Sequence, residues 1–344
     1  MKRYYFNIFV LCFVLFLVAC SDNSSPDQGT AGDENLSVGY YVNSTLGDKS
    51  FFDSAQRGIE RAGSELGYKT KTIEGGDNQA DWASGLESMV SSGSYDVIVT
   101  GTSQMTEIVT DIANRYPDMK FIFFDDVVEA KNVYSMTYSQ GEGSFLAGAF
   151  AALVTTSTEL ENANPEKIIG FVGGMDIPII NDFLSGYKQG AEYVDSDVQV
   201  IASYIGNFTD SPKAKELTLS QINAQKADIV YQVAASAGLG ILEAASEKNV
   251  YSIGVDSNQN DIYPGSVLTS MLKQIDNTVF QALEKLKDGT LEFDKVENLG
   301  MEQEAVGLAE DELYEEHVPE AIRKQMEDIK AKLQSGEIVV KSDL

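Results

Sequence analysis

The stretch Ile169–Val194, IGFVGGMDIPIINDFLSGYKQGAEYV, decides the fold. An apolar run from Ile168 to Val172 predicts a buried strand, and the Gly173-Gly174 pair allows the backbone to turn sharply after it. Apolar residues then recur at helical spacing from Phe183 to Ala191. A strand, a glycine turn and a helix place a loop at the carboxyl end of a strand, which is where open α/β sheets bind ligands. The stretch therefore predicts an α/β fold with a small-molecule site.

The same alternation of strand and helix runs through most of the chain. Strands are expected at residues 36–42, 69–73, 95–100, 120–124, 168–172, 199–204, 229–233 and 251–255. Helices are expected at residues 54–66, 81–91, 103–115, 144–154, 180–194, 212–224, 239–247 and 319–333. Elements of these lengths in this order predict βαβ units, which form parallel sheets through right-handed crossovers. Near the end, residues 338–340 predict an edge strand and the acidic segment 302–316 a surface excursion.

The pattern pauses at Ser139 and then repeats, which predicts two doubly wound parallel-sheet lobes of similar size. The expected boundaries are 36–140 and 257–289 for lobe 1, and 141–256 and 290–344 for lobe 2. The chain would cross between the lobes near residues 132–140, 254–256 and 289–293. If the lobes face each other across this hinge, the loops after their strands converge on one ligand cleft.

The N-terminus carries the pattern of an exported lipoprotein. Two basic residues precede an apolar run, Phe6–Ala19, that is too short to span a bilayer. The run ends in Leu17-Val18-Ala19-Cys20, which looks like a bacterial lipobox and predicts removal of a signal peptide, residues 1–19, and acylation of Cys20. The polar segment 20–35 cannot bury apolar area and predicts a flexible tether. We therefore expect a protein held by lipid on the extracytoplasmic face of a bacterial cell membrane. An ordinary secretory signal with a chance cysteine is the alternative.

The composition excludes several kinds of chemistry. A formal charge of −28 over 344 residues disfavours nucleic acid and acidic membrane surfaces as partners. The single histidine, His317, lies in an acidic segment, and the chain has no CxxC, GxGxxG or phosphate-loop motif, so no metal or other cofactor is expected. Ser270–Lys273 matches the SxxK pattern of penicillin-binding enzymes, but no KTG motif follows it. We therefore expect a binding protein rather than an enzyme.

The remaining candidate residues suit the binding of a planar, hydroxylated solute. Phe51 and Phe208 are expected in loops flanked by polar residues, and two aromatic rings could clamp a base. Three polar residues that follow expected strands could exchange hydrogen bonds with amines and hydroxyls, and one lysine could donate to a sugar oxygen. These four residues are Asn43, Asp125, Asp256 and Lys273. The alternative is that the aromatic rings close small cores and the acids cap helices.

Six stretches together are similar to the basic-membrane-protein family of lipoproteins, over essentially the whole mature chain. They are Asp48–Phe51 (DKSF), Glu142–Gly148 (EGSFLAG), Gly173–Pro178 (GGMDIP), Gly238–Gly240 (GLG), Ile253–Asp256 (IGVD) and Leu268–Lys273 (LTSMLK). The members of this family are purine-nucleoside receptors of ABC importers with the type I periplasmic-binding-protein fold. The resemblance implies that fold and that function for this chain.

The resemblance also implies roles for individual residues. Phe51 and Phe208 would sandwich the purine ring from opposite lobes, and Asp125 would read the edge of the base. Asp256 and Lys273 would hold the ribose. The loop that contains Ala235 and leads to Gly238 would also contact the ribose.

Four positions depart from the family pattern. Asn43 stands where the family usually has an aspartate, and an amide oxygen is a weaker acceptor than a carboxylate. Phe52 replaces an asparagine, and Ala235-Ser236 replaces a glycine pair, so added side chains approach the expected sugar site. The identity of the nucleoside therefore stays open.

These observations predict a lipid-anchored substrate-binding protein that works as a monomer. It would capture adenosine, guanosine or inosine and pass it to the permease and ATPase of an ABC importer. A sensory or adhesion lipoprotein without a transport role, and a receptor for another small solute, are alternatives. A nucleoside hydrolase is a third alternative, but it would need a metal-binding aspartate cluster near the first strand, where Asn43, Asp48 and Asp53 do not form one.

Overall fold

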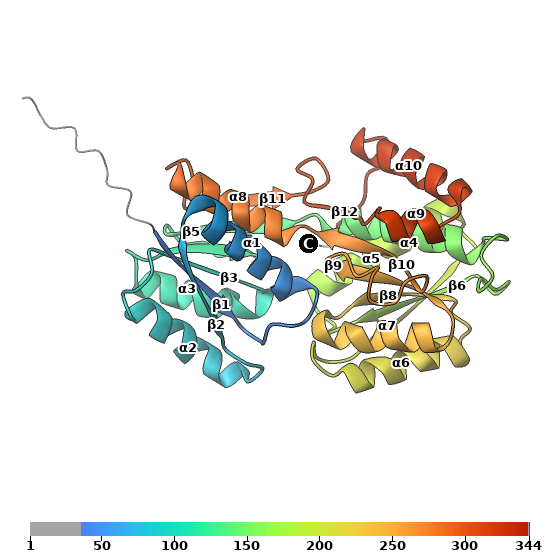
Figure 1. The fold of residues 1–344 in the computed structure, drawn as a ribbon, viewed down its shortest axis with the longest axis horizontal. Helices are drawn as coiled ribbons and strands as arrows, with labels where there is room; N and C mark the ends of the chain where they lie inside the picture. Colours follow the sequence, from blue (N-terminus) through green and yellow to red (C-terminus); the bar gives the residue numbers. More distant parts are fainter. Residues whose placement is uncertain (1–35, 343) are drawn as a thin grey trace, which may run out of the picture. The chain divides into compact units, whose positions relative to one another are not determined.

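The computed structural model describes residues 36–342 and 344, which belong to one compact unit. Strands and helices alternate along it and form two sheets of six strands, which confirms the predicted α/β fold (Figure 1). The predicted signal peptide at 1–19, the predicted lipidation site Cys20 and the predicted tether at 20–35 lie outside the described residues. Within the described part of the chain, no helix is both long enough and apolar enough to cross a membrane.

The first sheet has the strand order β11-β5-β4-β3-β1-β2, and all of its neighbours pair in parallel. Its strands are β1 (Ser37–Val42), β2 (Lys69–Glu74), β3 (Val97–Gly101), β4 (Lys120–Phe124), β5 (Val133–Tyr138) and β11 (Lys295–Leu299). The strand order changes direction between β1 and β3. Such a switch point opens a crevice outside the carboxyl ends of the two strands.

The second sheet repeats this plan, with the order β12-β10-β9-β8-β6-β7 and a switch point between β6 and β8. Its strands are β6 (Ile168–Gly173), β7 (Gln199–Tyr204), β8 (Ile229–Val233), β9 (Tyr251–Asp256), β10 (Val267–Lys273) and β12 (Val306–Leu308). Only β12, paired with β10, is antiparallel. The stretch that predicts the fold, Ile169–Val194, therefore begins on a strand at the second switch point.

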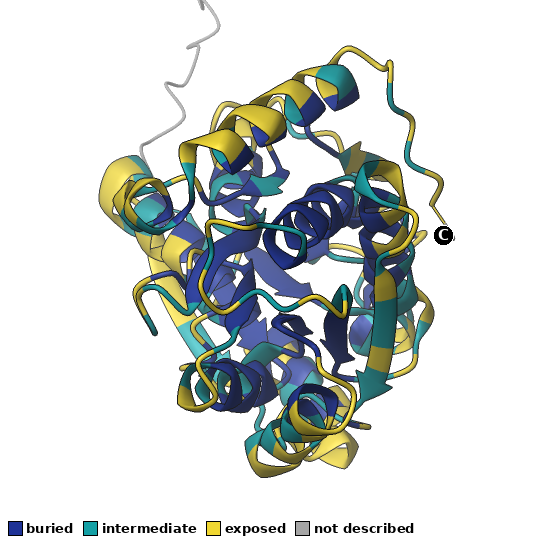
Figure 2. Ribbon diagram, turned by 90° about the vertical axis from the view of Figure 1, so that its right-hand side faces the viewer, coloured by how far each residue is buried: buried dark blue, intermediate teal, exposed yellow. Residues whose placement is uncertain are grey.

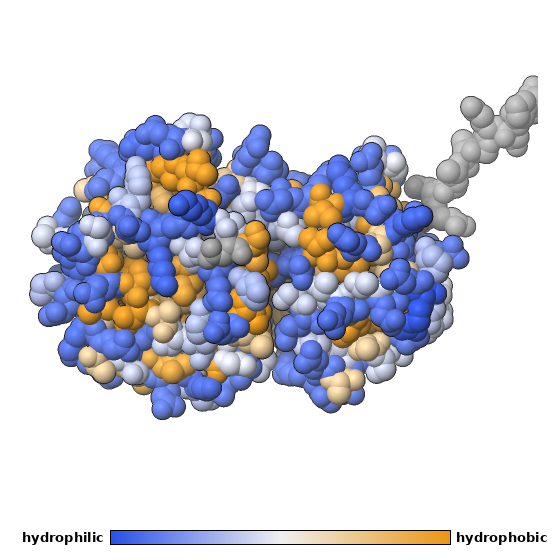
Figure 3. Space-filling view, turned by 180° about the vertical axis from the view of Figure 1, so that it is seen from behind, coloured by the Kyte–Doolittle hydropathy of each residue, from blue (hydrophilic) through white to orange (hydrophobic). Residues whose placement is uncertain are grey.

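Helices cover both faces of each sheet. The helices are α1 (Phe51–Leu66), α2 (Gln79–Ser91), α3 (Thr106–Arg115), α4 (Gln140–Thr155), α5 (Pro178–Val194), α6 (Ser211–Asn223), α7 (Gly238–Glu247), α8 (Ile275–Lys287), α9 (Glu312–His317) and α10 (Glu320–Gln334), with short 3-10 turns η1 (Ser103–Met105) and η2 (Ala235–Ala237). Central strands such as β3 and β8 are buried along their whole length because both of their faces are covered. Figure 2 shows this arrangement, with buried strands inside and exposed outer faces on the helices. The face in Figure 3 is largely hydrophilic, with separate apolar patches, which fits the acidic composition.

Helices α4 and α5 approach each other through glycine. A Cβ at Gly148 would lie 1.9 Å from the carbonyl oxygen of Tyr187, and a Cβ at Gly190 would lie 1.9 Å from that of Phe145. No side chain fits at these distances, so the two helices pack backbone against backbone. This contact fixes α5, whose first turns form a wall of the ligand cleft.

The strand membership corrects the predicted lobe boundaries. Val267–Lys273 was expected in lobe 1, but as β10 it pairs in parallel with β9 of the second sheet. Lys295–Leu299 was expected in lobe 2, but as β11 it pairs with β5 of the first sheet. The chain crosses between the sheets after β5, after β10 and after β11. The prediction failed because β9 and β10 are joined by a loop, residues 257–266, without the helix that marks other crossovers.

Three local predictions were also wrong. The alternation of strand and helix does not pause at Ser139, because β5 ends at Tyr138 and α4 begins at Gln140. The acidic segment 302–316 is not a surface excursion, since it contributes β12 and buries Val306, Leu308 and Tyr314. The segment 338–340 forms no strand. Its Ile338 and Val340 instead pack against the main core.

Candidate functional site

A cleft lies where the carboxyl ends of the strands of both sheets meet. Residues that line it directly follow β1, β3 and β4 of the first sheet and β8 of the second. Others lie in the turns after β6 and β7 or end β9 and β10. The space inside is about 170 Å³. One water molecule needs only about 10–15 Å³ of such space, so the cleft has room for a solute of many atoms.

The cleft brings together seven of the eight predicted ligand residues. They are Asn43, Phe51, Asp125, Phe208, Ala235, Asp256 and Lys273. Gly238 does not line the cleft. It begins α7, and a Cβ there would lie 2.0 Å from Oε1 of Gln232. The absence of a side chain at Gly238 thus serves the packing of the second lobe.

Phe51 is held by the capping of α1. It was predicted to lie in a loop, but it is the first residue of the helix. The buried carboxylate of Asp48 accepts hydrogen bonds from the backbone N–H groups of Ser50, Phe52 and Asp53, at 3.0, 2.9 and 3.1 Å. These bonds satisfy donors that a helix N-terminus leaves open, and they oppose the rise in the Asp48 pKa that burial causes. The DKSF stretch therefore fixes the point at which α1 and its aromatic ring enter the cleft.

Phe208 enters the cleft from the second sheet and depends on the glycine turn. A Cβ at Gly174 would lie 2.3 Å from Cδ1 of the Phe208 ring. Gly174 directly follows β6, and its N–H donates to the carbonyl oxygen of Val233 on β8. The turn after β6 thus makes room for an aromatic residue that follows β7.

The ends of β4 and β10 are joined by a buried ion pair. Nζ of Lys273 lies 2.5 Å from Oδ1 of Asp125, and the lysine is 1% exposed. The lysine also faces the rings of Phe183, Tyr138 and Phe51, with centroids 4.8, 5.3 and 5.9 Å from Nζ. Burial raises the pKa of Asp125, while Lys273 opposes this shift. The pair connects the two sheets at the floor of the cleft.

Asp256 is a second buried carboxylate beside this pair. Its Oδ2 accepts a hydrogen bond of 2.7 Å from the hydroxyl of Ser50. Burial raises the pKa of Asp256 to about 6, against the opposing effects of Lys273 and of the Ser50 hydrogen bond. Asp256 is therefore mostly ionised at neutral pH and can accept hydrogen bonds from a solute.

Asn43 offers an acceptor with no protein partner among the described residues. Its side chain is 3% exposed, and its Nδ2 donates to Oγ1 of Thr102 at 3.0 Å. Its Oδ1 is buried and has no hydrogen-bond partner. Such a group is unfavourable unless a ligand or water bonds it. Asn43 and Thr102 follow β1 and β3, the two strands of the first switch point.

The backbone of the lining carries strained conformations. Among the described residues, ten other than glycine have a left-handed φ, and four of these line the cleft. They are Thr102 at 83°, Asp125 at 75°, Ala235 at 46° and Asp256 at 63°. Each follows or ends a strand of one of the two sheets. Strain of this kind collects at ligand sites, where it directs polar groups toward a ligand.

The sequence did not predict several lining residues. Trp82 on α2 lines the cleft, and its indole N–H donates to the carbonyl oxygen of Gly76 at 2.7 Å. The start of α5 adds an apolar wall through Ile180 and Phe183, which adjoin Met175 of the glycine turn that was expected at the cleft. The helical spacing around Phe183 predicts the helix but does not distinguish cleft from core. Trp82 is the only tryptophan of the chain, which is a weak signal by itself.

Within residues 36–342, no group of three or more histidine, cysteine, aspartate or glutamate side chains could hold a metal ion. The polar groups that line the cleft are instead three carboxylates, one ammonium, three side-chain amides and several hydroxyls, accompanied by aromatic rings. This set can bind a neutral solute by stacking and hydrogen bonding.

Comparison with known proteins also indicates a protein that binds a solute. The sequence model of the family described as "Bmp: ABC transporter substrate-binding protein PnrA-like" matches residues 35–339. Basic membrane protein A of Borreliella burgdorferi is 27% identical, with 98% of this chain and 95% of the relative covered. The CD4+ T-cell-stimulating antigen of Listeria innocua is 26% identical, with 94% of each chain covered.

Solved structures share the architecture. A solute-binding protein of an ABC transporter system from Aeropyrum pernix has a TM-score of 0.81 and 27% identity, over 89% of this chain and 93% of that one. The lac repressor dimer has a TM-score of 0.58 and 14% identity, over 83% and 98%, and so shares the fold alone. These neighbours confirm the type I periplasmic-binding-protein fold. Together with the family match, they indicate a binding protein rather than an enzyme.

Proposed function

Because the chain belongs to the PnrA-like family of ABC transporter substrate-binding proteins, we propose that it captures a purine nucleoside in this cleft and delivers it to an ABC permease. The observation that carries the proposal is the position of two aromatic rings. Phe51 starts a helix that packs on the first sheet, and Phe208 follows a strand of the second, yet both line one cleft. Rings supplied from opposite sides suit a flat heteroaromatic base, which has two faces to stack.

The polar groups of the cleft suit the remainder of a nucleoside. Asp256 and Lys273 end neighbouring strands of the second sheet and would bond the ribose hydroxyls. Asp125, at the end of β4, would accept from the edge of the base. The free acceptor of Asn43 would take a further donor from the solute.

The charge of the cleft favours a nucleoside over a nucleotide. Its charged lining residues are Asp77, Asp125, Asp256 and Lys273, three acids against one base. A phosphate group would therefore enter a site with excess negative charge. The uncharged ribose of a nucleoside does not meet this repulsion.

The proposal includes the setting of the protein. The lipobox-like sequence that ends at Cys20 and the polar segment 20–35 support a lipid-anchored receptor on the extracytoplasmic face of a bacterial membrane. All residues that line the cleft belong to one compact unit, which supports action as a monomer, with ABC permease and ATPase subunits as partners. Metabolic labelling of the full-length protein with a palmitate analogue would test the anchor, and Cys20→Ala should abolish the label.

Isothermal titration calorimetry tests the ligand. Because the described residues belong to one compact unit with its own cores, we expect the soluble chain from Ser21 onward to retain the cleft. It would be titrated with adenosine, guanosine, inosine, ribose and inosine monophosphate. We expect one site that binds at least one purine nucleoside, with much weaker binding of ribose and of the nucleotide. Failure of all three nucleosides to bind would refute the proposal, and preferential binding of ribose would indicate a sugar receptor.

A further inference from the structure

Ser50 lies beside the cleft without lining it. It is fully buried and directly precedes α1. Its hydroxyl donates to Oδ2 of Asp256 at 2.7 Å, and the carbonyl oxygen of Val255 competes for the same proton at 3.1 Å. In the opposite direction, the hydroxyl of Ser257 donates to the carbonyl oxygen of Ser50 at 2.9 Å. Ser50 belongs to the first lobe, whereas Val255 and Asp256 belong to β9 of the second sheet.

We propose that Ser50 is a positioning residue whose hydroxyl fastens α1 to the end of β9 and thereby stabilises the closed cleft. We call Ser50, Asp256 and Ser257 the clasp. The inference rests on the proposed function, because closure matters when a solute is captured. Proteins of this fold close about hinges, and a contact made only when the lobes are together shifts the equilibrium toward closure.

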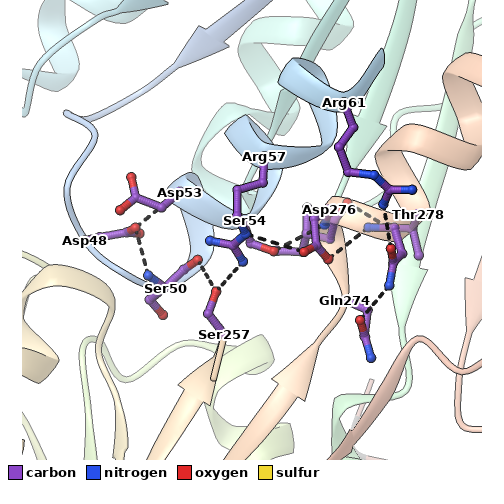
Figure 4. A network of polar contacts seen from close by, with 12 residues as sticks. Asp48, Ser50, Asp53, Ser54, Arg57, Arg61, Ser257, Gln274, Asp276 and Thr278 are labelled. Atoms are coloured by element: carbon purple, nitrogen blue, oxygen red, sulfur yellow. Dashed lines mark hydrogen bonds and ion pairs between the residues drawn. The ribbon is translucent and has the colours of Figure 1, made fainter. Parts of the chain in front are cut away.

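Further hydrogen bonds around the clasp also connect the first lobe to the second. Arg57, on α1, donates from Nη2 to the hydroxyl of Ser257 at 2.9 Å. Nε2 of Gln259 donates to the carbonyl oxygen of Lys49 at 3.1 Å. Figure 4 shows Ser50 and Arg57 reaching from the α1 side toward Ser257. All of these bonds join the first turns of α1 or the residues just before it to the end of β9 or the segment after it. Opening of the cleft at this edge would therefore break them together.

The clasp also positions a residue that lines the cleft. Asp256 has a left-handed φ of 63°, and its carboxylate is oriented by the Ser50 hydroxyl. A hydrogen bond from a neutral donor to a buried carboxylate is among the stronger kinds. Its loss would release the second lobe from α1 and also leave Asp256 with one donor fewer.

Ser54 supplies a matched control on the same helix. It is also buried, and its hydroxyl oxygen accepts from the backbone N–H of Asp276 at 3.2 Å. Asp276 lies in the first turn of α8, and α8 packs against α1 on the first sheet (Figure 4). Ser54→Ala therefore removes a similar group from the same helix but breaks no contact with the second sheet.

The test has one arm without ligand and one with it. Spin labels on Ser64→Cys and Lys248→Cys, both exposed, would report the distance between α1 and α7 by pulsed electron resonance. The chain from Ser21 onward has no other cysteine. We expect Ser50→Ala to add a population at longer distance without ligand, while Ser54→Ala leaves the distribution unchanged. With adenosine, guanosine or inosine as ligand, Ser50→Ala should weaken binding by about 10- to 100-fold, as for loss of a hydrogen bond to a charged group.

Several results would overturn the inference. These are a distance distribution of Ser50→Ala identical to that of the parent, or equal effects of Ser50→Ala and Ser54→Ala. If Ser50→Ala does not fold, Ser257→Ala removes the opposite half of the clasp, and the same criteria apply to it. If the parent binds no nucleoside, the proposed function fails, but the arm without ligand still decides whether the clasp holds the lobes together.

Discussion

Lys273 and Asp125 form an ion pair of 2.5 Å between the two sheets, since Lys273 ends β10 and Asp125 follows β4. The pair lies at the floor of the cleft, beside the carboxylate of Asp256. Lys273, expected to hold the sugar, is therefore in direct contact with Asp125, expected to read the base. Substitution of these charged residues should therefore change both the stability of the protein and its binding of a ligand.

Lys273→Met should strongly destabilise the protein. Removal of the ammonium leaves Asp125 buried without its cation, which typically lowers the free energy of unfolding by about 3–5 kcal/mol. Urea denaturation at pH 7.5 measures the loss. Lys215→Met is the control, because Lys215 pairs with Glu243 and Glu247 on the surface, and its loss should cost about 0–1 kcal/mol. Equal losses for the two variants would mean that the buried pair contributes no more than a surface one.

Asp256→Asn should stabilise the protein at neutral pH. The folded carboxyl holds its proton up to about pH 6, whereas the unfolded one loses it near pH 4, so the free energy of unfolding falls as the pH rises between these values. Asparagine avoids this loss and tolerates a left-handed φ, so we expect a gain of up to about 3 kcal/mol at pH 7.5. Urea denaturation at pH 7.5 and pH 4 checks this. The gain should nearly vanish at pH 4, and a gain independent of pH would show that ionisation of Asp256 is not its cause.

Phe208→Ala should weaken nucleoside binding by about 1–3 kcal/mol, the usual contribution of a base stacked on an aromatic ring. Calorimetry with the best-bound nucleoside measures the change. Tyr193→Ala is the control, because Tyr193 is a 47% exposed aromatic residue on α5 that does not line the cleft. An unchanged affinity of Phe208→Ala would place that ring outside the binding site.

Gly174→Ala should impair binding through Phe208. The added methyl group would lie 2.3 Å from the ring, so the ring must move, and affinity should fall by as much as in Phe208→Ala, about 1–3 kcal/mol. Gly307→Ala adds the same group where no atom lies within 4 Å and should leave affinity unchanged. If Gly174→Ala binds as tightly as the parent, the glycine turn does not set the position of Phe208.

The sequence predicts much of this fold because local patterns determine most of its elements. β4, β7 and β8 have the predicted bounds, since each is a short apolar run between helical segments. The assignment of β10 and β11 failed for a non-local reason. Their partners, β9 and β5, are chosen by the packing of whole sheets, which no local pattern records.

The candidate site was predicted in part. Residues at strand ends, such as Asp125 and Asp256, follow from the rule that ligands meet the carboxyl ends of parallel strands. Trp82 and Ser50 were missed, because their roles depend on which helix faces the cleft and which loop crosses to the other sheet. Gly238 resembles part of a ligand loop in the sequence, but it does not line the cleft, and its lack of a side chain makes room for Gln232.

Trp82 makes the central claim directly measurable. It is the only tryptophan of the chain and lies in the lining of the cleft, so its fluorescence reports binding at this place. Titration of the soluble chain with a purine nucleoside should give a saturable change in the fluorescence of Trp82, with one nucleoside bound per chain and no change with ribose at the same concentrations. A flat signal with adenosine, guanosine and inosine, at concentrations where calorimetry also shows no heat of binding, would contradict the claim that this cleft binds a purine nucleoside.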